Sequence, residues 1–278
     1  MSLKLLAKGV VAATILTGVS ASQEPAAPQT QSLSAREQAE LQAIMAAAYL
    51  PRGGAPDSLA ILPAPPEAGS AAQARDDEAA RAGQALRGSP RWAQATQDAN
   101  LDLPGAAQTF ECALGVAISE AGTPHTYTLL RRSMADVGLS TYPTKTKYQR
   151  TRPFVVTSTE ICTPEQAEFL RHDGSYPSGH SAIGWGWALI LTEAAPDRQN
   201  QVLARGRAFG QSRVVCNVHW LSDTEEGRVM ASATVARLQA APEFQTDLAA
   251  ARAEIAAART AGSTPTRDCA VEAAQLAG

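Results

Sequence analysis

The sequence predicts an all-α protein built as a helical bundle, and three observations lead to that fold class. Only 5% of the 278 residues are aromatic, whereas a β-sandwich is rich in Tyr, Val and Thr. Alanine is very frequent, and its high helix propensity and small side chain favour close helix packing. Strand-like alternation is confined to one short segment, Phe154–Ser158. With 45% hydrophobic residues, the chain can bury a substantial core, in one large domain or two small ones.

Residues 1–22 have the three-part pattern of a secretory signal peptide. Two lysines precede an apolar run from about Gly9 to Val19, and small residues follow it. That run is shorter than the roughly 18 residues of a membrane-spanning helix, and no later segment reaches that length without charges. We therefore expect a mature protein that is periplasmic or secreted and has no membrane span. A retained anchoring helix is the alternative.

Residues 23–69 are rich in proline and glycine and predict an extended N-terminal arm, interrupted by a helix-compatible stretch at Ala35–Tyr49. Such an arm could wrap a neighbouring subunit, so a homo-oligomer is one hypothesis. Residues 70–278 form the predicted all-α domain. Its helix-compatible segments, with Gly, Pro or Asn near most joints, are 71–86, 90–99, 108–120, 124–137, 180–195, 197–209, 223–239 and 243–261.

Four cysteines follow the predicted signal peptide: Cys112, Cys162, Cys216 and Cys269. None is paired with another at the spacing of a metal site. An even number of cysteines in an exported chain predicts two disulfides. The sequence leaves all three connectivities open, as well as the alternative of free buried cysteines.

The charge balance argues against one class of partner. With 24 basic and 27 acidic residues the formal net charge is −3, which supplies none of the positive excess that non-specific nucleic-acid binding needs. We therefore expect no nucleic-acid polymer as a partner.

Three clusters concentrate cations, glycines and histidines in a chain that has only four histidines. They are residues 145–153, residues 173–180 and residues 212–223. Each has an ordinary interpretation by itself. The first could be a solvated surface, the second a turn and helix start capped by Ser178, and the third could hold His219 and Asp223 as a helical pair.

Taken in order, the clusters read Lys-x6-Arg-Pro, Pro-Ser-Gly-His and Ser-Arg-x5-His-x3-Asp. This pattern resembles the PAP2 superfamily, which contains bacterial class A non-specific acid phosphatases, membrane lipid phosphatases and vanadium haloperoxidases. The local sequences 174–180 and 210–220 are similar to the class A acid phosphatases in particular, and the resemblance covers about residues 58–238. Every fixed position of the pattern is filled, by Lys145, Arg152, Pro153, Pro177, Ser178, Gly179, His180, Ser212, Arg213, His219 and Asp223.

The resemblance implies a phosphate-binding site and an all-α bundle that brings the clusters together. A phosphate monoester carries up to two negative charges, so its site needs fixed donors and permanent cations. Lys145, Arg152 and Arg213 would supply the charge. Ser178 and Gly179 would bind phosphate at the start of a helix, where unpaired N–H groups and the helix dipole favour an anion. We expect Lys145 and Arg152 on a loop that meets the helices of the other two clusters.

The resemblance also implies the catalytic roles. His219 would attack phosphorus to give a phosphohistidine, and Asp223 would hold its other ring nitrogen. His180 would protonate the leaving alcohol and then activate water. Because His180 must start charged, we expect the reaction to work best below neutral pH.

The predicted function is that of an exported acid phosphatase, a phosphomonoesterase of broad specificity acting on small-molecule phosphate monoesters. The scheme needs no cofactor and no metal. A vanadium-dependent haloperoxidase is the alternative, because vanadate resembles phosphate in shape and charge. Transfer to an alcohol instead of water stays open, as does the natural substrate. Outside the pattern, we expect His125 to be structural, and His172 and Asp173 are candidates for the mouth of the pocket.

Overall fold

A computed structural model describes residues 45–277. The predicted signal peptide and the first part of the predicted arm lie outside the described residues. Within residues 45–277 the regular secondary structure is entirely helical, which confirms the all-α prediction.

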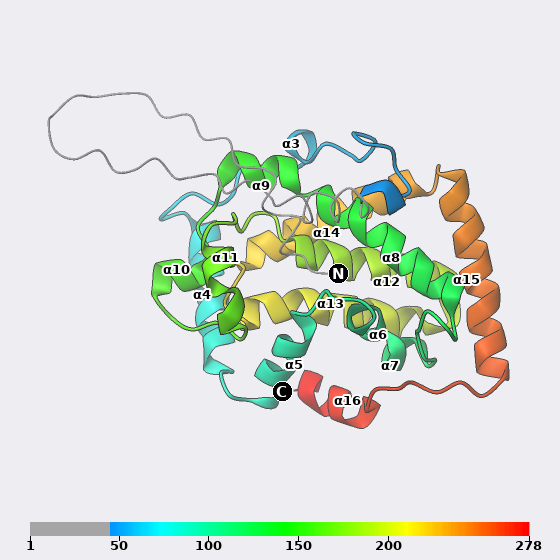
Figure 1. Cartoon of the computed structure of the whole chain (residues 1–278). Helices are drawn as coiled ribbons and strands as arrows, with labels where there is room; N and C mark the ends of the chain where they lie inside the picture. The colour runs from blue at the N-terminus through cyan, green and yellow to red at the C-terminus, as the bar shows by residue number, and fades with distance from the viewer. Residues whose placement is uncertain (1–44, 278) are drawn as a thin grey trace, which may run out of the picture.

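The longer helices form the body of the molecule (Figure 1), and the shorter ones lie in the connections between them. The longer helices are α4 (Ala71–Ala85), α5 (Pro90–Asp98), α8 (Pro124–Leu139), α12 (Gly179–Ala194), α13 (Gln199–Val215), α14 (Leu221–Leu238), α15 (Pro242–Thr260) and α16 (Cys269–Ala277). The shorter α-helices are α3 (Ser58–Ile61), α6 (Gly105–Gln108), α7 (Glu111–Leu114), α9 (Tyr142–Tyr148), α10 (Pro153–Thr157) and α11 (Ala167–Arg171). Two 3₁₀ turns, Pro164–Gln166 and Pro196–Arg198, complete the set.

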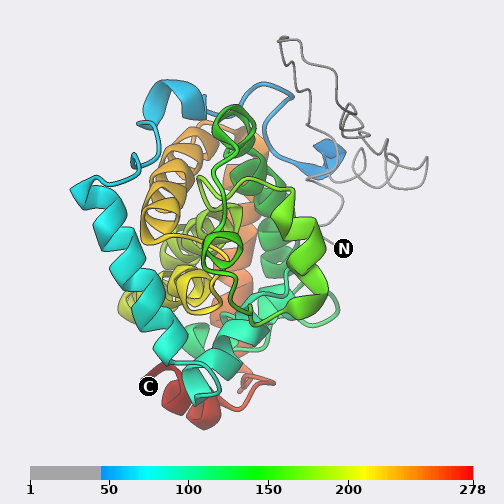
Figure 2. The same ribbon diagram turned by 90° about the vertical axis from the view of Figure 1, so that its left-hand side faces the viewer.

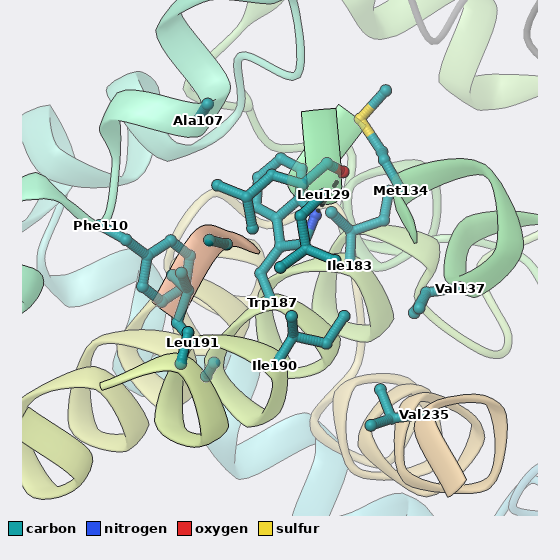
Figure 3. Close-up of a cluster of buried hydrophobic side chains, with 14 of the residues drawn as sticks. Ala107, Phe110, Leu129, Met134, Val137, Ile183, Trp187, Ile190, Leu191 and Val235 are labelled. Atoms are coloured by element: carbon teal, nitrogen blue, oxygen red, sulfur yellow. Dashed lines mark hydrogen bonds between the residues drawn. The ribbon is translucent and has the colours of Figure 1, made fainter. Parts of the chain in front are cut away.

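Helix α12 is the centre of the bundle. It packs against α8, α13, α14 and α15 (Figure 1), and most of its residues are buried. This burial follows from its sequence, which is apolar or small nearly all round instead of along one stripe. Trp187 of α12 lies in the core, where its ring meets that of Phe110 edge to face with 6.3 Å between the ring centres (Figure 3), and its Nε1 donates to the Leu130 carbonyl at 2.9 Å.

Glycines allow α12 to lie unusually close to its neighbours. A Cβ atom added to Gly184 would stand 2.3 Å from the ring of Phe209 on α13, and one added to Gly206 would stand 2.4 Å from the Ala188 side chain of α12. At Gly227 of α14 the added atom would meet the Ser178 carbonyl at 2.5 Å. These contacts leave no room for a methyl group. The three helices are therefore fixed against each other near the ends that carry the motif residues.

Most predicted helices are confirmed, with ends shifted by a few residues. The caps explain several starts: Ser70, Ser89 and Ser178 each accept a backbone N–H from the first turn of the helix that follows. The helix predicted at 197–209 continues to Val215 as α13.

Two local predictions are wrong. The helix predicted at 108–120 is replaced by the one-turn helices α6 and α7, because α7 ends at Gly115 with a left-handed φ of 79°. The strand-like segment 154–158 forms α10, in which Pro153 occupies the first helical position and pre-sets its backbone. A run of five residues is too short for its pattern to distinguish a strand from a helical turn.

Both predicted disulfides are present, and the structure selects one of the three connectivities: Cys112–Cys269 and Cys162–Cys216. The first joins α7 to the start of α16. The second joins the residue that follows α13 to the segment between α10 and α11.

The described part of the predicted arm packs on its own chain. The backbone N–H groups of Tyr49 and Leu50 donate to the Asp136 carboxylate of α8 at 2.9 and 3.0 Å. The Tyr49 ring meets Phe244 of α15 edge to face at 5.4 Å. Whether the arm also contacts a second subunit stays a prediction.

Across residues 45–277, every helix is too short or too polar to cross a membrane.

Candidate active site

The structure brings residues of all three sequence clusters to one pocket. Figure 2 views the molecule from the side on which α4, α10 and α11 lie. The pocket is lined by Gly138, Tyr142, Lys145, Arg152, Phe169, Leu170, Asp173, Gly179, His180, Ile183 and His219. Five of these are predicted site residues. The other three, Ser178, Arg213 and Asp223, are fully buried and are not among the lining residues.

Short structured segments position the first cluster. Lys145 belongs to α9, and Arg152 is the residue that precedes α10. The expectation of a plain loop is therefore wrong for Lys145. Two proline residues explain the difference, because Pro143 and Pro153 stand at the first turns of α9 and α10, where a missing N–H costs nothing.

The other two clusters stand at helix ends. Gly179 and His180 open α12, where backbone N–H groups have no intrahelical acceptor. The Ser178 hydroxyl caps this helix by accepting from the Ser181 N–H at 3.2 Å. Arg213 lies in the last turn of α13, and Asp223 lies in the first turn of α14.

Arg213 is the most unusual cation of the site. Its side chain is fully buried, and none of its three guanidinium nitrogens has a hydrogen-bond partner within residues 45–277. Burial, together with the nearby charge of Arg152, lowers the pKa of Arg213 to about 9. A buried cation without a partner is strongly unfavourable unless an anion compensates it. The site is therefore preorganised for a negative charge.

The other two cations have partners. Arg152 donates from Nε to the Asp173 carbonyl, from Nη1 to the Val218 carbonyl and from Nη2 to the Asp173 carboxylate, at 2.8, 2.9 and 2.8 Å. The Lys145 ammonium lies 3.5 Å from the same carboxylate and also donates to the Gly174 carbonyl. Burial lowers the pKa of Lys145, and Asp173 opposes that shift.

Asp173 is thus an internal counter-ion of the pocket, which the sequence had indicated only as a candidate for the mouth. Its neighbour His172 is directed elsewhere, with a side chain 72% exposed and Nε2 3.1 Å from Glu168. His125 is also exposed and lies outside the pocket.

His219 is oriented by contacts at both ring nitrogens. Nδ1 lies 3.3 Å from Asp223 Oδ2, and Nε2 lies 3.1 Å from Arg152 Nη1. Because the guanidinium can only donate, Nε2 must be the unprotonated nitrogen, and the proton sits on Nδ1 toward the carboxylate. Burial, followed by the charge of Arg152, lowers the pKa of His219 well below its ordinary value. His219 therefore presents a lone pair to the pocket.

Asp223 is fully buried and completely engaged. Its Oδ2 also accepts the Trp220 N–H at 2.8 Å, and its Oδ1 accepts from Arg150 at 2.7 Å. Burial raises the pKa of Asp223, and Arg150 opposes that rise.

His180 has one ring nitrogen bound to the backbone and the other free to titrate. Its Nε2 lies 3.1 Å from the Ala99 carbonyl, so Nε2 carries a proton and Nδ1 is the titrating nitrogen. Burial and then the charge of Arg213 lower the pKa of His180 well below its ordinary value. Both histidines are neutral near pH 7, and a charged His180 requires more acid or a nearby anion.

Three contributors to this region were not among the residues predicted from the sequence. Asp76 of α4 and Arg150 lie behind Asp223, and Tyr142 lines the pocket. Arg150 lies inside the first cluster, so its charge was visible there. No sequence pattern connects Asp76 with the motif, because α4 meets α14 only in the folded chain.

Residues 45–277 contain no group of three or more His, Cys, Asp or Glu side chains arranged to hold a metal ion. Metal independence stays a prediction.

Comparison with known proteins gives consistent similarities. A sequence model of the PAP2 superfamily matches residues 126–245, which contain all three clusters. An acid phosphatase of Zymomonas mobilis is 43% identical over 213 residues, covering 75% of this chain and 79% of the relative. A non-specific acid phosphatase of Providencia stuartii is 44% identical over 209 residues, covering 75% of this chain and 84% of the relative. A non-specific acid phosphatase of Salmonella typhimurium is 43% identical over 195 residues, covering 70% of this chain and 78% of the relative.

Proposed function

The chain belongs to the PAP2 superfamily and, within it, to the bacterial non-specific acid phosphatases. On this basis we propose that it hydrolyses phosphate monoesters with broad specificity, through a phosphohistidine and without a metal. The observation that carries this proposal is the buried, unpartnered guanidinium of Arg213 beside two neutral histidines. A phosphoryl group supplies the anion that Arg213 lacks.

Substrate binding is assigned to the cations and to the start of α12. Arg213 and Arg152 hold the equatorial oxygens, and Lys145 adds a point charge. The first-turn N–H groups at Gly179 and His180 direct donors at the same anion, and Ser178 orders that turn as its cap. The phosphoryl group enters between Arg152 Nη1 and His219 Nε2 and replaces the 3.1 Å contact between them.

In the first step the lone pair of His219 Nε2 attacks phosphorus, and the bond from phosphorus to the leaving oxygen breaks. The electron pair of that bond stays on oxygen, which takes a proton from Nδ1 of His180. Asp223 stabilises the positive charge that develops on the His219 ring. In the second step water attacks phosphorus, the P–N bond breaks, and His180 takes the proton of the water.

The protonated His180 required at the start explains an acid optimum. Burial and Arg213 oppose its charge, but a bound phosphate dianion offsets the charge of Arg213 and favours the imidazolium. The reaction is therefore fastest below neutral pH, where the solution supplies the proton and the bound dianion stabilises the His180 imidazolium.

We also propose export and a three-part chain: a signal peptide at 1–22, an arm at 23–69 and the catalytic domain at 70–278. The two disulfides support an oxidising compartment, such as the periplasm or the medium.

The test is release of phosphate from an aryl phosphate at pH 5–7 with excess chelator, for the mature wild type and His219→Ala. We expect chelator-resistant turnover that falls at least about 1,000-fold in the variant. His172→Ala is the matched control, because His172 is exposed outside the pocket, and it should retain full activity.

A second readout tests the intermediate directly. Mixing with ³²P-labelled substrate and quenching in alkali should trap label on the wild type and none on His219→Ala. Halide oxidation with vanadate and peroxide, in the absence of phosphatase turnover, would instead assign the chain to the haloperoxidases.

A further inference from the structure

Arg150 is a buried guanidinium that the roles above do not use. Its side chain is 8% exposed, and both terminal nitrogens have two partners each. Nη1 donates to Asp223 Oδ1 at 2.7 Å and to the Ser222 hydroxyl at 2.8 Å. Nη2 donates to Asp76 Oδ2 at 2.8 Å and to Gln73 Oε1 at 2.7 Å. Arg150 thus joins α4 to the first turn of α14.

Asp76 anchors this arrangement from α4. Its side chain is 1% exposed, its Oδ1 accepts the Ser222 N–H at 2.8 Å, and its Oδ2 accepts from the Ser222 hydroxyl at 2.6 Å and from Arg150. Arg150 is therefore held by one carboxylate and directed at a second one.

Asp223 depends on this partner because no solvent reaches it. It has 0% side-chain exposure, and it also accepts the Trp220 N–H and contacts the His219 ring. A carboxylate in this position favours the neutral acid unless a cation compensates it. A neutral Asp223 would no longer stabilise the charge that develops on His219 when Nε2 bonds to phosphorus.

We infer that Arg150, anchored by Asp76, is a positioning residue for phosphoryl transfer, acting through the Asp223 carboxylate on His219. Arg150 does not line the pocket. This role rests on the proposed function.

Several charged and titratable groups around Asp223 influence the pH at which its carboxylate takes up a proton. Cations that act on it are Arg150 and, from α9, Lys145. His219 faces it from the segment before α14, and Tyr176 from the second cluster also interacts with it. Arg150 is the only one of these cations in direct contact with the carboxylate among the described residues. Its removal therefore changes the protonation of Asp223 more than any other single substitution there.

The experiment compares pH–rate profiles of the mature wild type, Arg150→Met and Arg150→Lys. In Arg150→Met, loss of the charge lets Asp223 take up a proton at higher pH. Activity relative to the wild type should therefore fall about 10- to 100-fold near pH 5, and this deficit should become smaller toward pH 7. Arg150→Lys keeps a charge without the planar fork and should rescue part of the acid activity. Asp76→Asn leaves the charge of Arg150 in place and removes a negative charge close to Asp223, so its acid limb should shift in the opposite direction, and by less.

Two controls separate this role from damage to the fold. Arg75→Met removes an exposed arginine of α4 that pairs with Glu225 of α14 across the same helix contact, and it should leave the profile unchanged. Inhibition by sulfate, which reports the intact anion pocket, should stay within about threefold of wild type in Arg150→Lys and Asp76→Asn.

A uniform loss at all pH values, or no loss, in an Arg150 variant that still binds sulfate would overturn the inference. If Arg150→Met does not fold, the same criterion applies to Arg150→Lys. Failure of the proposed function is distinguishable, because it would appear in the wild type as missing phosphohistidine.

Discussion

Two arginines of helix α13 show how one residue type serves two purposes. Arg205 and Arg213 are both buried. Arg205 donates to both carboxylate oxygens of Asp98, one at 3.2 Å, and its Nε lies 3.5 Å from Glu272 of α16. Burial lowers the pKa of Arg205, but Asp98 and Glu272 together raise it by more, so it lies above its ordinary value. Arg213 has no such partner, and its pKa falls to about 9.

The difference between the two arginines separates a structural buried charge from a ligand-binding one. At Arg205 the compensating anion is part of the chain, so the pair joins α5, α13 and α16 as structure. At Arg213 the compensating anion must come from outside, so the protein stays less stable until a ligand binds. Burial alone does not identify a site; burial without a partner does.

The largest expected effect comes from replacing each arginine by methionine. Arg213→Met should lower kcat/KM about 1,000-fold, because a fixed donor to the transition state is lost, and should raise the urea midpoint measured without phosphate. Arg205→Met should destabilise the fold by about 3–5 kcal/mol, because Asp98 loses its cation. Urea unfolding and steady-state kinetics test both. Equal destabilisation by the two substitutions would break the comparison.

An intermediate effect is expected from the coupling between anion binding at Arg213 and protonation of His180. Burial and Arg213 keep the pKa of His180 well below its ordinary value, and a bound anion should raise it. Sulfate stays a dianion from pH 8 to pH 5, so its calorimetric affinity should rise about tenfold over that range as His180 takes up a proton. His180→Gln should remove most of this rise. A flat profile in the wild type would show that Arg213 and His180 are not coupled.

The smallest expected effect concerns Asp173. Its cations are intermediate between Arg205, which is paired within the chain, and Arg213, which has no partner among the described residues. Asp173 is an internal carboxylate on Lys145 and Arg152, at 3.5 and 2.8 Å, and a bound phosphate competes with it. Asp173→Asn should therefore strengthen inhibition by inorganic phosphate about threefold. Glu168→Gln, which removes an exposed charge on α11, is the control and should leave inhibition unchanged. Weaker inhibition in Asp173→Asn would mean that the carboxylate orients the cations instead of competing for them.

Much of the fold could be predicted because its signals are local. Serine caps and first-turn prolines mark the starts of α4, α5 and α8 in the sequence itself. Short elements could not be predicted this way. The helices α9 and α10 have only a few residues each, and their conformation depends on proline positions and tertiary contacts.

The site was predictable in its members and less so in their protonation. The ordered motif identified the residues, because their spacing along the chain is characteristic. The neutral state of His180 depends on burial and on Arg213, neither of which is visible in sequence. Asp76 and Arg150 act through contacts between segments about 74 residues apart, so no local pattern marks them as a pair.

The glycines along α12, α13 and α14 limit how this protein can vary over generations. Gly184, Gly206 and Gly227 touch no reacting group, yet even a methyl group at any of them would push apart helices that carry the pocket residues. Their positions should therefore accept as few alternatives as the histidines do. A comparison of related sequences that equates an invariant residue with chemistry would count them as catalytic, although what is preserved there is the absence of a side chain.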